Sequence, residues 1–183
     1  MKIIREREEN STLASYKIDP ARSSAQFSVR HMMISNVRRG FGSVQGTVAY
    51  DSQNVAASNV EVEINASTIS TLENARDTHL KSPDFLHVEK YPTITLKSTA
   101  VTPNGDGELR VKGDLTIHGV TKEVILDVEG PSTEEKDTYG NARIGASATT
   151  KIRRSDFGLT WNAPLETGGI LVGEISKSMW KSL

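Results

Sequence analysis

Residues 107–128 read GELRVKGDLTIHGVTKEVILDV, and this stretch carries the clearest fold signal in the chain. Apolar side chains fall on one parity of its first half: Leu109, Val111, Leu115 and Ile117. The second half alternates in the same way after His118-Gly119. A period of two is typical of a strand with one apolar and one solvated face. The stretch therefore predicts a hairpin of two antiparallel strands.

The same alternation recurs in short segments along most of the chain. It predicts strands over residues 16–19, 24–30, 43–51, 59–65, 93–101, 142–154 and 170–180. Residues 31–40 break the pattern, and we expect one helical turn within them, around residues 32–35. Apolar residues at helical spacing predict one principal helix over residues 74–81, which Pro83 ends.

About eight or nine alternating strands with short connections predict an all-β, antiparallel sheet with one helix. Such a sheet either closes into a barrel or packs as a sandwich, and the pattern alone leaves both open. Several inward positions carry small residues that would leave a barrel partly empty: Ala25, Gly46, Gly113, Ala146, Ala148 and Gly173. A partly empty barrel lined by aliphatic side chains would form a lipid pocket.

Length and composition narrow the class of protein. The 183 residues suit one domain, which we place at residues 15–183 after an N-terminal extension over residues 1–14. A net charge of -1 argues against nucleic acid as a partner, and the absence of cysteine excludes disulfides and thiolate sites. No apolar run suits a secretory signal or an integral membrane segment, so we expect a cytoplasmic protein.

Several blocks of residues match the motifs of one family in order. Residues 18–31 read IDPARSSAQFSVRH, residues 35–41 read SNVRRGF, and residues 76–92 read RDTHLKSPDFLHVEKYP. Residues 113–122 read GDLTIHGVTK, and residues 154–159 read RSDFGL. From Tyr16 to about residue 180 the chain resembles the YceI-like proteins. It departs from their pattern at Arg22, where His is frequent, and at Lys81, where Arg is frequent.

The resemblance implies a lipocalin-like, eight-stranded antiparallel β-barrel with one helix. It also implies a carrier that holds a polyisoprenoid, a fatty acid or a fatty amide in the barrel, for sequestration, storage or transport. No general catalytic activity follows from it, so we expect neither catalytic residues nor a cofactor. The expected partner is a long-chain lipid or isoprenoid ligand.

The inward positions of the expected strands supply a candidate cavity lining: Phe27, Val29, Phe41, Val48, Val62, Ile64, Phe85, Ile94, Leu96, Leu109, Val111, Leu115, Ile117, Leu126, Ile144, Ala146 and Ile175. Burying one methylene is worth about 0.8 kcal/mol, so such a lining binds a long chain with few polar contacts. Basic and imidazole side chains are candidates for the ligand's polar head group: His31, Arg38, His79, His118 and Arg154. Other polar residues of the matching blocks are expected to form a structural network: Asp77, Thr116, Thr121 and Asp156.

Other functions remain open at this stage. The four histidines form no close pair, and no cysteine assists them, so we expect no metal site. A cluster of His, Asp and Arg at a barrel mouth could perform acid–base chemistry on a bound lipid, although no nucleophile elbow or cofactor loop is present. The barrel could also be a packed stress or interaction module without ligand. Open barrel edges invite pairing, so a homodimer is compatible with each alternative.

Overall fold

The computed structural model describes the backbone of residues 12–31, 35–162 and 172–182, and the side chains of residues 12–29 and 40–162. In chain order the described elements are β1 (Ala14–Lys17), β2 (Ser24–His31), β3 (Ser35–Phe41), β4 (Val44–Tyr50), η1 (Val55–Ala57), β5 (Asn59–Asn65), η2 (Ala66–Thr68), β6 (Ile69–Ser70), α1 (Asn74–Lys81), β7 (Thr93–Pro103), β8 (Glu108–Ile117), β9 (Val120–Glu129), β10 (Glu135–Lys136), β11 (Ala142–Arg143), β12 (Ala146–Arg153), η3 (Arg154–Phe157) and β13 (Val172–Ser182). Among these described residues, no helix is long and apolar enough to cross a membrane.

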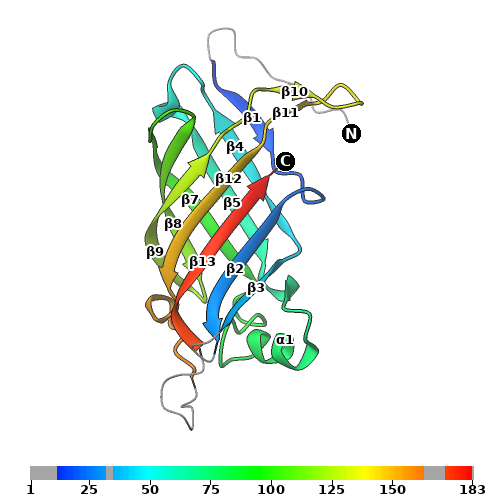
Figure 1. Cartoon of the computed structure of the whole chain (residues 1–183), viewed down its shortest axis with the longest axis vertical. Helices are drawn as coiled ribbons and strands as arrows, with labels where there is room; N and C mark the ends of the chain where they lie inside the picture. Colours follow the sequence, from blue (N-terminus) through cyan, green and yellow to red (C-terminus); the bar gives the residue numbers. More distant parts are fainter. Residues whose placement is uncertain (1–11, 32–34, 163–171, 183) are drawn as a thin grey trace.

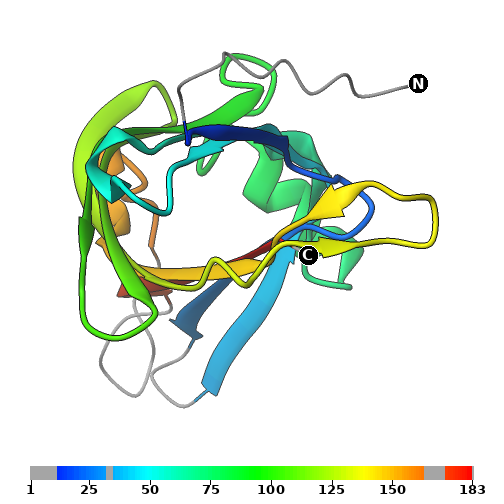
Figure 2. The ribbon, with the colours of Figure 1, turned by 90° about the horizontal axis from the view of Figure 1, so that it is seen from above.

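Eleven strands form one sheet in the order β1-β4-β5-β7-β8-β9-β12-β13-β2-β3-β6, and β10 pairs with β11 in a separate hairpin. All the strand pairs that the structure describes are antiparallel, as the sequence predicts. Figure 1 shows the tilted strands side by side, and Figure 2 looks along the rolled sheet, whose strands surround a common interior. Each long strand therefore turns one face inward.

The two edges of the sheet do not pair with each other in the described strands. β1 forms one edge and the two-residue strand β6 forms the other, next to the end of β3. Near β6, the Thr68 hydroxyl accepts hydrogen bonds from the backbone amides of Gly42 and Ser43 at 3.1 and 3.3 Å. The sheet is thus rolled but not closed, and its eleven strands exceed the eight of the expected barrel.

The hairpin at residues 107–128 forms as predicted. β8 and β9 pair from Glu108–Glu129 to Ile117–Val120, and His118 and Gly119 form the connecting loop with φ of 54° and 72°. A two-residue hairpin loop of this kind needs positive φ at both positions. The alternate apolar residues of the two strands are buried: Val111, Leu115, Ile117, Val124 and Leu126.

Two expected segments differ from the structure. Residues 35–41, where the alternation breaks, form β3 and pair with β2 along seven residues. Their own pattern does not alternate, so this strand is specified by its neighbour. The helical turn expected around residues 32–35 falls mainly on residues 32–34, which lie outside the described residues. The long strand expected over residues 142–154 is interrupted after β11. There the Gly145 carbonyl accepts from the Ser132 amide at 2.8 Å, and the Gly145 amide donates to the Ser132 hydroxyl at 3.0 Å.

The helix α1 has the predicted bounds and lies at one end of the rolled sheet, hereafter the α1 end (Figure 1). The Glu73 carboxylate caps it by accepting from the amides of Ala75 and Arg76 at 3.0 and 2.7 Å. Beyond the helix, the amide of Phe85 donates to the Ser82 carbonyl in a tight turn. This turn begins the segment that connects the helix to β7 and covers the α1 end.

Candidate functional site

Apolar side chains from neighbouring strands line the inner face of the sheet. Nine of the expected lining residues are buried: Val62, Ile64, Phe85, Ile94, Leu96, Val111, Leu115, Ile117 and Leu126. Seven are half-buried: Phe27, Val29, Phe41, Val48, Leu109, Ile144 and Ala146. All of the buried nine except Phe85 belong to one core cluster, which spans β5, β7, β8 and β9.

Three of the six small residues expected on the inner face, Gly113, Gly46 and Ala25, lie where the chain is closely packed. A Cβ atom at Gly113 would lie 2.8 Å from the Lys97 carbonyl oxygen on the neighbouring strand. At Gly46, where φ is +152°, it would lie 2.0 Å from the carbonyl oxygen of Glu61. Ala25 is 4% exposed within the core cluster. These positions allow close approach of strands, so they do not by themselves show open space inside.

His79 joins an aromatic cluster at the α1 end. Its Nε2 lies 2.8 Å from the Asp84 carboxylate, and its ring meets Phe85 and Trp161 edge-on, with centroids 5.1 and 4.5 Å away. Phe85 and Trp161 also contact each other at 5.2 Å. The sequence analysis missed Trp161, whose only signal was an aromatic residue shortly after the RSDFGL block.

Arg154 is buried beside this cluster and begins η3. It is 4% exposed, and its Nη1 donates to the carbonyl oxygens of Leu159 and Trp161 at 2.6 and 2.8 Å. A buried guanidinium needs such acceptors, because an unpaired charge inside a protein is costly. Arg154 therefore fixes the chain that carries Trp161 onto the His79 ring.

His118 lies at the tip of the β8–β9 hairpin, also at the α1 end. Its Nδ1 is 3.3 Å from the Phe157 carbonyl oxygen, and its ring meets Tyr91 at 4.8 Å. Gly119 is required beside it, because a Cβ there would lie 2.5 Å from the Tyr91 ring. The hairpin tip, η3 and the segment before β7 are thus packed together through His118.

The residues expected to form a polar network have separate partners. The amide and hydroxyl of Thr71 donate to Asp77, and the hydroxyls of Thr116 and Thr121 lie 2.7 Å apart. Burial raises the pKa of Asp77, but hydrogen bonds from Thr71 outweigh it and leave the pKa below its ordinary value. Asp156 is exposed and has no hydrogen bond or ion pair with the described part of the chain, so it does not join these contacts.

Three further predictions fall on side chains outside the described residues: His31, Arg38 and Ile175. Their strands are described, and the backbone of Arg38 pairs with Ser28. Within the residues that the structure does describe, no group of three His, Cys, Asp or Glu side chains is placed to hold a metal ion.

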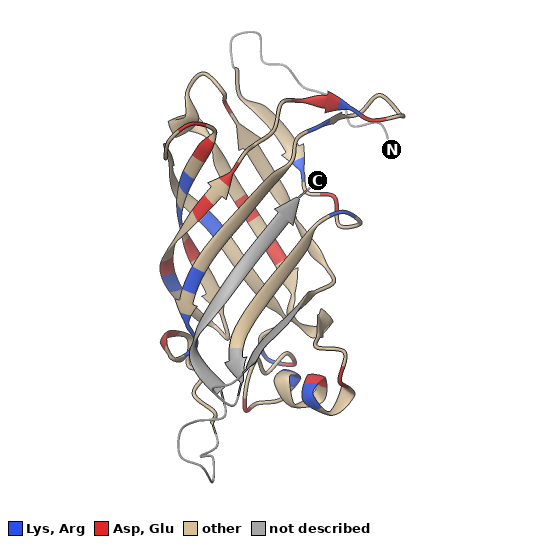
Figure 3. Cartoon of the chain, in the orientation of Figure 1, with Lys and Arg blue, Asp and Glu red and all other residues tan. Residues whose placement is uncertain are grey.

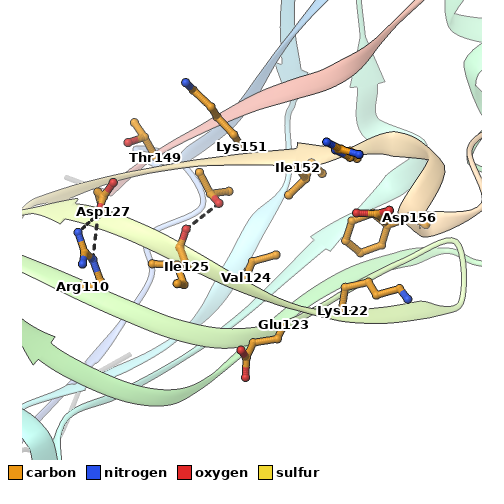
Figure 4. A pocket seen from close by; sticks show the side chains of 13 residues that line it. Arg110, Lys122, Glu123, Val124, Ile125, Asp127, Thr149, Lys151, Ile152 and Asp156 are labelled. Carbon is orange, nitrogen blue, oxygen red and sulfur yellow. Dashed lines mark hydrogen bonds and ion pairs between the residues drawn. The ribbon is translucent and has the colours of Figure 1, made fainter.

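A groove of about 780 Å³ lies between β9 and β12, hereafter the β9–β12 groove (Figure 4). The two strands pair only from Ser147–Glu129 to Thr149–Asp127, although both continue toward the α1 end. Sequence analysis did not predict this groove, because both strands alternate regularly through it.

Side chains of both faces line the β9–β12 groove. The inward residues Val124, Ile152 and Phe157 contribute, and so do the outward residues Ile125 and Lys151. Figure 4 shows Val124 and Ile152 between the two strands. The groove thus reaches side chains that belong to, or pack on, the core cluster.

A rolled antiparallel sheet with an apolar inner face and a helix at one end is a lipocalin-like fold. The model of the YceI-like domain family matches residues 16–177. The chain therefore belongs to the YceI-like family. A UPF0312 protein from Vibrio cholerae is 38% identical to it over 148 residues, which are 80% of this chain and 78% of that relative.

Solved structures share the fold. BcnA of Burkholderia cenocepacia matches with a TM-score of 0.77 at 20% identity, over 90% of this chain and 97% of that one. A polyisoprenoid-binding domain from Saccharophagus degradans, implicated in plant cell wall breakdown, matches with a TM-score of 0.61 at 13% identity. That match covers 93% of this chain and 98% of the other. At these identities the likeness is one of fold.

Proposed function

We propose that this protein binds a long-chain amphiphilic lipid inside its rolled sheet and holds it for storage, sequestration or transport. The ligand class comprises polyisoprenoids, fatty acids and fatty amides. One observation carries the proposal: the inner face is apolar across β5, β7, β8 and β9 and continues through half-buried side chains such as Phe27 and Phe41. In this proposal the rolled sheet serves as the wall of a lipocalin-like barrel.

The energetics favour a hydrocarbon chain as the ligand. Each buried methylene contributes about 0.8 kcal/mol, so ten of them contribute about 8 kcal/mol before the costs of ordering. A net binding free energy of about 8 kcal/mol corresponds to a dissociation constant of about 1 μM, and it needs more than ten buried methylenes once the costs of ordering are subtracted. No specific polar contact along the chain is needed. Kinship with a fold that includes a polyisoprenoid-binding domain supports the same ligand class.

We assign the polar residues of the α1 end to closing the interior, and not to catalysis. The Arg154 guanidinium is occupied by two carbonyls, and the His79 imidazole is occupied by Asp84. Occupied and packed groups of this kind hold a structure in place, whereas a general base must reach the proton that it removes.

The test is to obstruct the interior and leave the outer face intact. Ala146→Trp places a large ring on the inward parity of β12, and Ser147→Trp places the same ring on the opposite parity. Each variant is titrated with a fluorescent fatty acid, which is then displaced by palmitate or farnesol. We expect Ala146→Trp to lose most binding and Ser147→Trp to keep it.

As a control, circular dichroism and urea denaturation test whether both tryptophan variants are folded. A folded Ala146→Trp protein that binds as well as the wild type would contradict the interior site. Wild-type protein that binds none of these lipids would contradict the proposed function itself.

A further inference from the structure

The wall of the rolled sheet splits on one side of β12 and not on the other. β12 pairs with β13 along all eight of its residues, from Ala146–Ser182 to Arg153–Ile175. With β9 it pairs along only three. Beyond those three pairs the backbones are no longer paired. The hydroxyl of Thr150 instead donates a hydrogen bond to the backbone carbonyl of Ile125 at 2.8 Å.

This split lets one surface groove reach residues of both faces of the sheet. In an intact sheet, backbone hydrogen bonds separate the residues of the two faces. Here the consecutive residues Val124 and Ile125 line the same groove, as do Lys151 and Ile152. Val124 is 9% exposed and belongs to the core, whereas Ile125 is 53% exposed on the outside. The floor of the groove is therefore formed by side chains of the core, and its outer rim includes the exposed Ile125.

Three basic side chains without a partner in the described part of the chain line the same groove. Lys122, Lys151 and Arg153 line the groove and are exposed, and their side chains make no hydrogen bond or ion pair with described residues. Figure 4 shows the Lys151 ammonium extending outward from β12, where its long stem leaves it mobile in solvent.

The acidic side chains of the groove are mostly neutralised. Asp127 accepts from Arg110 at 3.4 Å, and Glu123 lies 3.0 Å from the Lys112 ammonium. Asp156 alone among the lining carboxylates lacks a partner in the described chain. Among the described residues, three cations without a partner against one such carboxylate leave a surplus of positive charge beside the groove.

We propose that the β9–β12 groove holds the anionic head group of the amphiphile whose hydrocarbon chain lies in the interior. The inference rests on the proposed function and adds to it a ligand with a carboxylate or phosphate head. The chain passes between the strands over Val124 and Ile152, while the head stays with Lys122, Lys151 and Arg153. Exposed ion pairs of this kind weaken with added salt, so the preference for anionic ligands falls as ionic strength rises.

The experiment compares ligands that share a chain and differ in head charge. Palmitate is paired with palmitamide, and farnesyl phosphate with farnesol. The test variant is Lys122→Gln/Lys151→Gln/Arg153→Gln. The matched control, Lys17→Gln/Lys97→Gln/Lys136→Gln, removes the same charge from exposed positions that do not line the groove.

We expect the groove variant to bind both anionic ligands about tenfold more weakly, since it loses three exposed ion pairs that are individually weak. Its affinity for the two neutral ligands should stay within about twofold of wild type, as should all affinities of the control. Loss for only one of the two anions identifies the head group as the carboxylate or the phosphate.

Two results would overturn the inference and leave lipid binding intact: an equal loss in the control variant, or unchanged affinity for both anions in the groove variant. Failure of wild-type protein to bind any of the four ligands would overturn lipid binding as well. A second readout uses the variant Ile125→Cys, labelled with an environment-sensitive dye. The label is specific because the wild-type chain contains no cysteine. Its emission should shift with anionic ligands, and an equal shift with neutral ones would contradict head-group binding here.

Discussion

The strand β9 has two neighbours, and its contacts with them differ sharply. It pairs with β8 along ten residues and with β12 along three. β9 has a single alternation of inward and outward residues, so this pattern cannot distinguish its neighbour β8 from its neighbour β12. Alternation therefore specifies which face is buried, and the extent of each ladder depends on how the whole sheet rolls. Where the ladder is lost, the groove forms.

Charge distribution sharpens the contrast between these two regions. On the continuous wall, outward charges pair across strands: Lys97 with Glu61 at 3.1 Å, and Lys112 with Glu123 at 3.0 Å. Figure 3 shows both signs of charge interleaved over β7, β8 and β9. Beside the β9–β12 groove, Lys151 and Arg153 have no such partner in the described chain. The outward charges of the continuous wall are thus paired, whereas the described charges of β12 beside the groove are not.

The largest expected effect distinguishes the stability of the two regions. Leu126 is 3% exposed and lies opposite Val111 in the continuous wall, so Leu126→Ala should cost about 2–5 kcal/mol through the cavity it leaves. Ile152 is only half-buried at the groove, so Ile152→Ala should cost less than half as much. Urea denaturation measures both. Equal losses would show that the groove is packed as firmly as the wall.

A smaller effect is expected at Thr150, whose side chain bridges the groove. Thr150→Val removes the hydrogen bond to the Ile125 carbonyl and keeps the shape, at a cost of about 1 kcal/mol. Hydrogen exchange should become faster in β9 and β12 near residues 125 and 150, while the β8–β9 ladder keeps its protection. Uniformly faster exchange over both ladders would mean that the two regions open together.

The smallest expected effect is the loss of stability at low pH. It depends on the Asp137–Arg143–Asp19 contacts, which lie at the end of the sheet opposite α1 and away from both neighbours of β9. Asp137 accepts from Asn141 and Arg143, and these hydrogen bonds hold the pKa of Asp137 well below its ordinary value. Arg143 also donates to Asp19 at 3.0 Å, which lowers the pKa of Asp19. A lowered carboxyl pKa stabilises the fold above about pH 4, the pKa of the unfolded chain, and this gain is lost as pH falls below it.

Asp137→Asn should therefore be less stable than wild type at neutral pH and lose less stability between about pH 4 and pH 2. Thermal unfolding across that range measures the slope. If stability falls equally steeply with pH in the two proteins, the acid sensitivity comes from other carboxylates and not from Asp137.

Much of this fold could be predicted because its signals are local. Alternation predicted the β8–β9 hairpin, β5 and the inward set around Leu96 and Leu115, and helical spacing followed by Pro83 predicted α1. β3 could not be found in this way, since its pairing with β2 is set by tertiary context. The closed eight-stranded barrel is not confirmed. The edge strands β1 and β6 are short and do not pair with each other in the described chain.

Candidate site residues were harder to predict than strands. Residue type brought His79, His118 and Arg154 to notice, and the structure places all three at the α1 end. Residue type alone could not tell that Arg154 would be buried against carbonyls. Lys122 and Ile152 gave no signal as a site, because their role depends on a split between two strands that are regular in sequence.

The most direct test of the central claim is native mass spectrometry of freshly purified protein, followed by solvent extraction and identification of any bound lipid. The account predicts a stoichiometric long-chain species, released on unfolding and bearing an anionic head. Protein that is purified empty, and stays empty after incubation with isoprenoid phosphates and fatty acids, would contradict the claim and favour a packed interaction module.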